Sequence, residues 1–285
     1  MEKYTIMINT KGTREIKGII DNYKKCKNVH KIIVTFPQGT IPPNYIPQNS
    51  ISIPSSSSSQ SHISTSNIPP LVYHVPVSPS LNGRFQAYNT SQTSGIFTVD
   101  DDLFVPCKDV NLAYDVWVNG GYKDTGGMVG FYPRLIKKGK YHGWVGVWWT
   151  GEFQAVLTKA SFVGRDRMRE YWGEEYKDVR DVVERIGQCE DIAMGKLVAK
   201  GGGGVGYVGG GITDYGLLKG VSVGTKNHHK VRGGCVKEID EIIGEGWGEG
   251  KWETVWWGWR RPGGWGEWIS GDLGEFFKWR WMEGG

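Results

Sequence analysis

The sequence predicts an α/β domain organised around a parallel sheet. The first observation is a strand, a helix and a second strand within the first 36 residues, the βαβ order that lays two strands side by side in parallel. The second is the segment from Gly95 to Cys107, GIFTVDDDLFVPC, in which a short apolar run ends abruptly in three aspartates. Ligands of open α/β sheets bind at the carboxyl ends of strands, so this segment is the first candidate for a functional site.

The composition fits a folded domain and excludes several classes of protein. The chain has 285 residues, of which 39% are apolar and 22% charged. A formal net charge of +4, without any basic run, does not indicate a nucleic-acid partner. No apolar stretch reaches the ~18 residues of a membrane span and no signal peptide is visible, so we expect a soluble protein or one whose anchor lies outside this sequence. The four cysteines lack C-x-x-C spacing, which argues against zinc.

The N-terminal elements follow from apolar runs and helical spacing. Residues 4–10 (YTIMINT) and 31–36 (KIIVTF) have the character of buried strands. Between them, Thr13 can cap a helix whose apolar face consists of Ile16, Ile19, Ile20 and Tyr23. Residues 37–70 are rich in proline and serine, and we expect a flexible insertion, with its Ser/Pro-rich part at about 47–70.

Strand and helix patterns continue through the middle of the chain. Residues 71–77 resume strand character, 80–85 (SLNGRF) predict a polar turn, and 96–99 form the buried strand before the aspartates. A helix with one apolar face is expected next, formed by Val110, Tyr114, Trp117 and Val118. Residues 128–134 indicate another strand, and 144–149 with 152–158 suggest a hairpin joined at Thr150 and Gly151.

Two helical regions then precede a run of glycines. Helical spacing joins Met168, Trp172, Val179, Val183 and Ile186, and Gly173 divides this region into two helices. Residues 188–191 (QCED) lead a further helix, IAMGKLVAK. Residues 201–211 are nearly pure glycine, and we expect a loop. It follows a helix rather than a strand, so the context of a dinucleotide-binding loop is missing.

The last part of the chain, residues 245–285, differs in character from the rest. Nine of the 14 tryptophans lie here among Gly, Glu, Lys and Arg, with no helical or alternating period. We interpret it as a disordered, low-complexity or out-of-frame tail, so the expected domain is residues 1–244. The competing interpretation is an aromatic platform for sugars or single-stranded nucleic acid.

The aspartate triplet has two interpretations from the residues alone. Adjacent carboxylates repel one another, so Asp100, Asp101 and Asp102 at a strand end require a cation or hydrogen-bond donors. One interpretation is a divalent-metal site that holds a phosphorylated ligand, and the other is a solvated acidic turn.

Seven motifs up to Gly244 resemble glycosyltransferase family 64, the exostosin-like enzymes and their plant glycosyl inositol phosphorylceramide relatives. In chain order they are YTIMINT, SLNGRF, VDDDLFVPC, VGFYPR, VWWTGEFQAVLTKASF, QCEDIAMGKLVAK and GVSVGTKNHHKVRGGCVKE. Each is weak alone, but the order across about 230 residues is a specific signal. The resemblance implies a GT-A fold, that is, a Rossmann-like mixed sheet flanked by helices. It also implies a retaining, metal-dependent transferase that uses a nucleotide-sugar donor.

The resemblance also implies roles for the donor-side residues. Asp102 is expected to bind Mn²⁺ or Mg²⁺ directly, and Asp100 and Asp101 to contact ribose or orient the site. Asn82 and Arg84 are expected to bind the donor, with the Arg84 guanidinium placed for the diphosphate. A metal that bridges carboxylate and phosphate oxygens would stabilise the departing diphosphate.

Two motifs further along the chain complete the implied site. Asp191 matches the second acid of the family's Cys-acid-Asp motif and is the expected catalytic carboxylate; alone, it could equally be a favourable charge at a helix N-terminus. His228 is expected to bind the donor and Arg232 to assist catalysis, both at the leaving diphosphate; either could instead lie exposed on a polar turn. Cys189 and Cys235 correspond to the family's paired cysteines, which implies a disulfide and an oxidising lumen.

The chain also departs from the family pattern, and a rival function stays open. The opening loop INTKGTREI is shorter than the family's, the glycine run stands where a strand is usual, and the closing strand after residue 244 is absent or overwritten. We expect a hexosyl- or N-acetylhexosaminyl-transferase of the Golgi or ER lumen that acts on a glycan or glycolipid, is membrane-associated in the full-length family and has no nucleic-acid partner. The rival is a catalytically inactive sugar-binding or scaffolding relative. A metal-dependent phosphohydrolase is a weaker rival, because residues 4–10 contain no nucleophilic aspartate.

Overall fold

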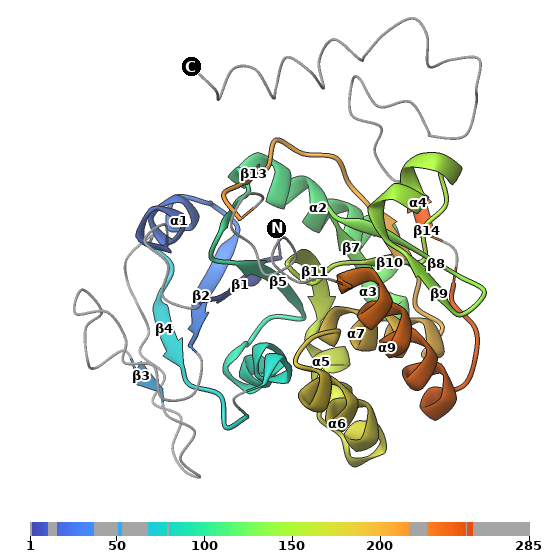
Figure 1. The fold of residues 1–285 in the computed structure, drawn as a ribbon. Coiled ribbons are helices and arrows are strands. Elements are labelled where there is room, and N and C mark those ends of the chain that lie inside the picture. The colour runs from blue at the N-terminus through green and yellow to red at the C-terminus, as the bar shows by residue number, and fades with distance from the viewer. Residues whose placement is uncertain are drawn as a thin grey trace, which may run out of the picture.

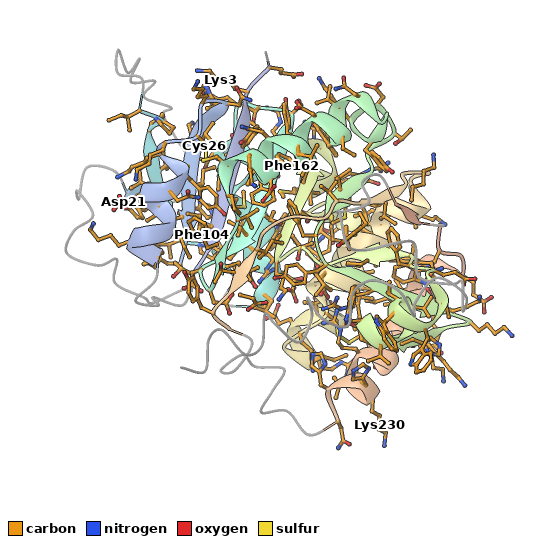
Figure 2. All side chains as sticks on the ribbon, turned by 90° about the horizontal axis from the view of Figure 1, so that it is seen from above. Lys3, Asp21, Cys26, Phe104, Phe162 and Lys230 are labelled. Atoms are coloured by element: carbon orange, nitrogen blue, oxygen red, sulfur yellow. A yellow bond between two sulfur atoms is a disulfide. The ribbon has the colours of Figure 1, made fainter. Side chains whose placement is uncertain are left out.

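The computed structural model describes most of the chain up to residue 252. The described residues are 2–10, 16–36, 51–52, 68–78, 80–216, 227–248 and 250–252. They form a central twisted sheet with helices packed on both of its faces (Figure 1). Two apolar clusters make up the core, one on each face, because successive strand residues alternate between the faces. The side chain of Phe162 lies in this interior, whereas that of Lys230 lies at the periphery (Figure 2).

The central sheet is mixed. Its order is β14-β12-β7-β11-β5-β1-β2-β4-β3, and β11 runs antiparallel to both of its neighbours. The strands are β1 (Tyr4–Asn9), β2 (Val29–Thr35), β3 (Ile51–Ser52), β4 (Leu71–His74), β5 (Gly95–Asp100), β7 (Met128–Gly130), β11 (Ala160–Gly164), β12 (Val205–Tyr207) and β14 (Gly250–Trp252). The predicted fold class, an α/β domain with a GT-A-type mixed sheet, is confirmed.

The predicted βαβ unit is present at the N-terminus. Strands β1 and β2 pair in parallel, and α1 (Ile16–Tyr23) connects them. The four residues of its predicted apolar face are all buried. The predicted cap, Thr13, lies outside the described residues. The unit places the carboxyl ends of β1 and β2 beside that of β5, which also pairs in parallel with β1.

Two predictions on either side of β4 need correction. The proline- and serine-rich stretch contains a short strand, β3, which pairs in parallel with β4. The expected polar turn at residues 80–85 is the start of a 3₁₀ helix, η2 (Leu81–Thr90), whose first turn Ser80 caps by accepting from the Asn82 N–H. Phe85 and Ala87 anchor this helix because both are buried in the core.

The predicted hairpin of residues 144–158 is wrong. Residues 143–150 form α4 (Gly143–Thr150), which packs on β8 (Pro133–Lys137), and only β10 (Ala155–Val156) of the second half is a strand. Valine and tryptophan favour strands, but tertiary packing overrides this preference. A Cβ added at Gly146 would lie 2.7 Å from Leu135 Cδ2, so the helix approaches the strand closely, and Gly151 ends it with φ of 70°. The expected strand at 128–134 is correspondingly divided between β7 and β8.

Most of the remaining helices cover one face of the sheet. They are α5 (Arg165–Tyr171), η3 (Glu174–Tyr176), α6 (Lys177–Ile186), α7 (Glu190–Lys200) and α9 (His228–Ile243). The predicted break at Gly173 is confirmed, because this residue separates α5 from η3 and α6. On the other face, α1 is joined by α2 (Cys107–Asn119), and α3 (Tyr122–Thr125) follows α2. No helix in the described part of the chain is both long and apolar enough to cross a bilayer.

The sheet continues through two segments for which no strand is expected. The glycine-rich run contains β12, which pairs with β7, so residues 201–211 are not simply a loop. The start of the predicted tail contains β14, which pairs in parallel with β12. Two residues just before β14 contact the buried Lys196 of α7. The Lys196 ammonium lies 2.9 Å from the Gly246 carbonyl and over the ring of Trp247, and it also lies 2.5 Å from the Asp240 carboxylate. These contacts favour a domain that extends beyond residue 244, the boundary expected from the sequence.

This packing predicts that a chain ending at residue 244 is less stable than one ending at 252. The shorter chain loses Trp247, β14 and one acceptor of a buried ammonium, worth about 2 kcal/mol or more. We expect a melting temperature lower by about 4–8 °C for a domain of this size. Calorimetry of both truncated chains measures it, and equal melting temperatures would contradict the assignment of these residues to the domain.

Candidate active site

The three aspartates after β5 have three different surroundings. Asp100 pairs with Arg84, whose Nη2 lies 3.1 Å from its carboxylate. Asp101 is buried, and its Oδ2 accepts a hydrogen bond of 2.5 Å from the Thr10 hydroxyl. Among the described residues, the Asp102 carboxylate has no hydrogen-bond or ion-pair partner. The triplet is therefore not a uniform acidic turn, and Asp102 is the member left to bind a ligand.

The segment around β13 (Thr213–Asp214) lies against Asp102. This strand pairs with β6 (Leu103–Phe104), and the Tyr215 N–H donates to the Asp102 carbonyl at 2.8 Å. A Cβ added at Gly216 would lie 2.0 Å from Asp102 Oδ2, so a side chain there would displace the carboxylate. Burial raises the pKa of Asp102 to about 6, and the nearby carboxylates of Asp100 and Asp214 add to this rise.

A single lysine offsets part of this negative charge. Lys159 Nζ lies 2.8 Å from Asp214 Oδ2 and 3.8 Å from the centre of the Tyr132 ring. The Tyr132 hydroxyl donates to the same carboxylate oxygen at 3.1 Å. No local pattern in the sequence predicts this cluster, because its members come from three distant segments that only the folded chain brings together.

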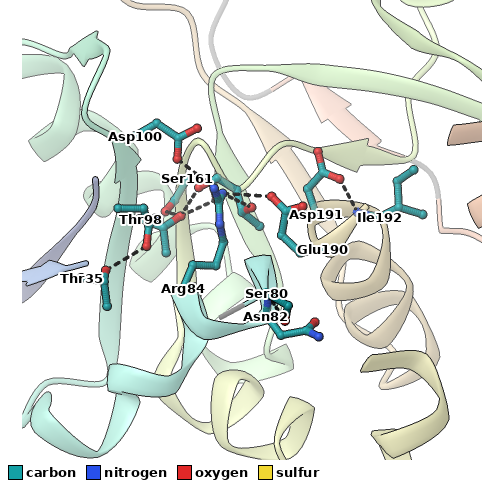
Figure 3. A network of polar contacts seen from close by, with 12 residues as sticks. Thr35, Ser80, Asn82, Arg84, Thr98, Asp100, Ser161, Glu190, Asp191 and Ile192 are labelled. Carbon is teal, nitrogen blue, oxygen red and sulfur yellow. Dashed lines mark hydrogen bonds and ion pairs between the residues drawn. The ribbon is translucent and has the colours of Figure 1, made fainter. Parts of the chain in front are cut away.

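Arg84 connects the aspartate edge to the second acidic motif. From η2 its guanidinium reaches both Asp100 and Glu190, the latter at 3.2 Å, and it also donates to Thr158 Oγ1 at 3.1 Å (Figure 3). Burial raises the pKa values of Asp100 and Glu190, and the cationic Arg84 opposes the rise at both. The predicted contact of Arg84 with a donor diphosphate stays a prediction. Glu190, its second partner, was not among the predicted site residues, although it adjoins Asp191 in the same motif.

The structure brings Asp191 and Arg232 together. Arg232 Nη2 lies 2.7 Å from both carboxylate oxygens of Asp191, and the Ile192 N–H donates to Oδ1 at 2.8 Å. Burial alone would raise the pKa of Asp191, but the Arg232 pair outweighs it and lowers the pKa below its ordinary value. The Arg232 guanidinium also stacks on the Tyr141 ring at 4.7 Å, and its Nε has no partner among the described residues.

The disulfide between Cys189 and Cys235 is present and fixes this pair. It joins the residue before α7 to the middle of α9, the helices that carry Asp191 and Arg232. A second disulfide, between Cys26 and Cys107, was not predicted; it joins the turn after α1 to the start of α2, just beyond the aspartates (Figure 2). An even number of cysteines, here four, is compatible with two disulfides, but their spacing in the sequence does not specify which cysteines pair.

Asn82 and His228, both predicted to bind the donor, have different surroundings in the fold. The buried Asn82 uses its side chain within the fold: Nδ2 donates to the Arg180 carbonyl at 2.9 Å, and Oδ1 accepts from the Tyr171 hydroxyl. Its direct effect is to hold η2 against α5 and α6, and contact with a donor stays a prediction. His228 is the first residue of α9; burial lowers its pKa, as do the neighbouring Arg232 and His229.

A cavity of about 500 Å³ opens beside the Asp191–Arg232 pair. Its lining is aromatic and basic and consists of Arg134, Tyr141, Gly143, Trp144, Val145, Asn227, His228 and His229. Tyr141 belongs both to this cavity and to the stack with Arg232, so the cavity adjoins the buried pair. Aromatic rings with basic neighbours suit a sugar that carries negative charge.

The described residues contain no complete set of three or more His, Cys, Asp or Glu side chains arranged to hold a metal. Mg²⁺ and similar ions commonly use one or two carboxylates together with phosphate oxygens and water. The carboxylate of Asp102, which has no partner in the part of the chain that the structure describes, suits such a site. A metal bound here would depend on the substrate for further ligands.

Comparisons with known proteins place the chain among glycosyltransferases. The family model described as "Glycosyl transferase family 64 domain" matches residues 4–246. The chain is 29% identical over 206 residues to Glycosylinositol phosphorylceramide mannosyl transferase 1 of Arabidopsis thaliana, covering 69% of this chain and 59% of that protein. It is 27% identical over 252 residues to Glucosamine inositolphosphorylceramide transferase 1 of Oryza sativa subsp. indica, covering 85% of this chain and 31% of that protein.

The chain thus spans a little over half of the first of these relatives and about a third of the second. Among solved structures, S. aureus TarS is similar with a TM-score of 0.44 and 8% identity, covering 73% of this chain and 35% of that one. This structural similarity is too low to support an argument about the site.

Removal of the Cys189–Cys235 disulfide is expected to destabilise the domain. Chain entropy for a sequence separation of 46 residues assigns the bond about 4 kcal/mol, or about 8–16 °C in melting temperature. The double variant Cys189→Ser/Cys235→Ser tests this by calorimetry. Cys26→Ser/Cys107→Ser is the matched control: it should lose similar stability but leave Asp191 and Arg232 in place. Free thiols at 189 and 235 in folded, secreted wild-type protein would contradict the bond.

Proposed function

The chain belongs to glycosyl transferase family 64, and on that premise we propose that it transfers a sugar from a nucleotide-sugar donor to a glycolipid or glycan acceptor, with retention of anomeric configuration. The observation that carries the proposal is the connection made by Arg84. One guanidinium joins the strand edge with Asp100 to the motif with Glu190 and Asp191. A substrate between the two would have a diphosphate-binding side and a sugar-transferring side.

The diphosphate side is the edge after β5. Asp102 would hold Mn²⁺ or Mg²⁺, because its carboxylate has no partner among the described residues and oxygen ligands suit these ions. The ion, when bound, would neutralise negative charge on the departing diphosphate. Arg84 presents a second cation from η2, although its bonds to Asp100 and Glu190 mean that it must share its donors with the ligand.

The transfer step needs stabilisation of a positively charged sugar. The bond between the anomeric carbon and the diphosphate oxygen breaks, and the electron pair leaves with the diphosphate. The acceptor hydroxyl forms the new bond on the same face of the sugar, which retains the configuration, and its proton passes to an oxygen of the departing diphosphate. The carboxylates of Asp191 and Glu190 would stabilise the oxocarbenium character of the sugar. Because Arg232 holds both oxygens of Asp191, we assign Asp191 an electrostatic role rather than that of an attacking nucleophile.

The acceptor side is the cavity beside Tyr141. Both plant relatives are named as transferases of inositol phosphorylceramide, one for mannosyl and one for glucosamine. We therefore propose a glycolipid with an anionic headgroup as the acceptor class, and a hexose or hexosamine as the sugar. Arg134 supplies the cationic group that such a headgroup needs, and His228 and His229 add ring nitrogens that can form hydrogen bonds with it.

The same proposal places the protein in the Golgi or ER lumen. Two disulfides suit an oxidising compartment, since cytosolic proteins rarely keep such bonds. An association with the membrane would come through its glycolipid acceptor or through parts of a longer protein.

Calorimetry followed by a transfer assay tests the function. We expect the protein to bind a uridine or guanosine diphosphate in the presence of Mn²⁺, and mass spectrometry to detect sugar transfer from the matching donor to an inositol phosphorylceramide. Absence of binding to every such nucleotide would defeat the proposal. Binding without transfer to any acceptor would favour a catalytically inactive sugar-binding relative.

Asp102→Asn is expected to weaken metal-dependent nucleotide binding at least tenfold. The amide keeps the size of the side chain but removes the charge that attracts a divalent cation. Titration with nucleotide at several Mn²⁺ concentrations measures the loss. Asp115→Asn, an exposed aspartate on α2, is the matched control and should bind as the wild type does. An unchanged Mn²⁺ dependence in Asp102→Asn would refute the ligand assignment.

Asp191→Asn is expected to keep nucleotide binding and to lower the rate of transfer by about 10²-fold or more. Because it leaves Arg232 buried and only partly paired, it should also cost about 3–5 kcal/mol of stability. Activity must therefore be compared at a temperature at which circular dichroism shows the variant to be folded. Transfer at the wild-type rate by the folded variant would show that this carboxylate has no part in catalysis.

A further inference from the structure

One segment of the chain has the sequence that accepts an N-linked glycan. Residues 89–91 are Asn-Thr-Ser, which matches the acceptor pattern Asn-x-Ser/Thr with a residue other than proline in the middle. No other asparagine in the sequence is followed two positions later by serine or threonine. A match this short indicates a glycan only if the asparagine is exposed and the protein folds in a secretory compartment.

The first condition is met, because the Asn89 side chain is exposed at the end of η2. Its amide forms no hydrogen bond with any residue that the structure describes. A substituent on Asn89 Nδ2 would therefore extend outward without breaking a contact of the fold. It would leave the protein beside a hollow of about 190 Å³, which Tyr88, Asn89, Ser91, Arg165 and Arg169 line.

The second condition is supported by the disulfides. The bonds between Cys26 and Cys107 and between Cys189 and Cys235 both join segments that are distant in the sequence. Disulfides of this kind form and persist in the oxidising lumen through which glycosylated proteins pass. The acceptor pattern and the disulfides are independent observations that indicate the same compartment.

The acceptor segment lies at the opposite edge of the sheet from the candidate active site. The Ser91 hydroxyl donates to Thr5 Oγ1 at 3.0 Å, near the start of β1. The other end of β1 is Asn9, which pairs with Asp100 at the active-site edge. At about 3.3 Å per residue, Thr5 and Asn9 are about 13 Å apart along the strand. A glycan on Asn89 therefore starts away from the aspartates that are proposed to face the donor.

The burial of Ser91 sets the order of events. Only 3% of its surface is exposed in the folded protein, and its hydroxyl bonds with Thr5 and Thr93. A transferring enzyme that reads this hydroxyl must reach it before the fold covers it. Asn89 remains exposed in the folded protein, so a sugar that is already attached does not hinder folding.

We propose that Asn89 carries an N-linked glycan, attached before the domain folds. The inference rests on the proposed function, because it requires the lumenal location given there. The co-substrate is an oligosaccharide held on a lipid diphosphate. Asn89 Nδ2 forms a bond to the anomeric carbon of the first sugar while the bond from that carbon to the diphosphate oxygen breaks. The electron pair leaves with the lipid diphosphate, and the amide releases one proton through a base of the transferring enzyme.

The test uses the full chain, expressed in a eukaryotic cell behind a cleavable signal peptide. We expect peptide N-glycosidase to cause a single shift in gel mobility and mass spectrometry to find aspartate at position 89 afterwards. Asn89→Gln and Ser91→Ala should abolish the shift, since each destroys the acceptor pattern. Asn89→Gln changes an exposed side chain only, so the variant should fold with both disulfides.

Two matched controls should keep the shift. Thr90→Ala changes the same segment but preserves Asn-x-Ser, and Asn119→Gln removes an exposed asparagine that lies outside any acceptor pattern. A wild-type chain without the shift, or a shift that persists in Asn89→Gln, would overturn the inference.

The protein from the cells that produce it naturally separates this inference from the proposed function. A glycan at Asn89 with no free thiols supports the inference. Disulfides without a glycan overturn only the Asn89 assignment, whereas free thiols without a glycan overturn the lumenal location as well. Nucleotide binding and sugar transfer are measured separately, and Asn89→Gln should match the wild type in both, because Asn89 lies at the opposite edge of the sheet. Failure of the wild type in these two assays defeats the proposed function, whatever the state of Asn89.

Discussion

The ion pairs of Arg84 are the interaction on which the candidate site depends. Its guanidinium is held by η2 and reaches both Asp100, at the end of β5, and Glu190, at the start of α7. Without it, the buried carboxylate of Glu190 would lose the cation that it pairs with, and it would face the partly buried carboxylate of Asp100. The same contact fixes the distance between the strand edge and the α7 motif, so η2 sets the width of the site as well as its charge.

The parts of this domain that could be predicted are those that short patterns determine. Ile16, Ile19 and Ile20 reveal α1 because a helix buries one face, and the apolar run before Asp100 reveals β5 because a central strand is buried on both faces. Residues 144–149 are predicted as a strand because their valines and tryptophans favour strands locally, but they lie in α4. Only contact with β8, through the close approach of Gly146 to Leu135, selects the helix.

The candidate site also contains some features that a local motif predicts and others that it does not. The disulfide between Cys189 and Cys235 could be predicted because both cysteines occur in recognisable local motifs, and the same motifs are the basis on which Asp102, Asp191 and Arg232 are predicted as site residues. The contact of Arg84 with Glu190 and the closure of Gly216 over Asp102 join segments far apart in the chain, and no local spacing encodes them. Asn82 also occurs in a motif, but the motif does not reveal that its side chain forms hydrogen bonds with Arg180 and Tyr171 that hold η2 in place.

The Asp191–Arg232 pair is better explained by function than by stability. A buried ion pair can often be replaced by apolar residues of similar volume without loss of stability, because the desolvation of two ions offsets their attraction. The fold nevertheless holds this pair by a disulfide on one side and the Tyr141 ring on the other. Arg232 keeps the pKa of Asp191 low, so the carboxylate stays charged in a site from which water is largely excluded. In the proposed transfer, such a charged and immobile carboxylate would stabilise the developing oxocarbenium ion without reorganisation.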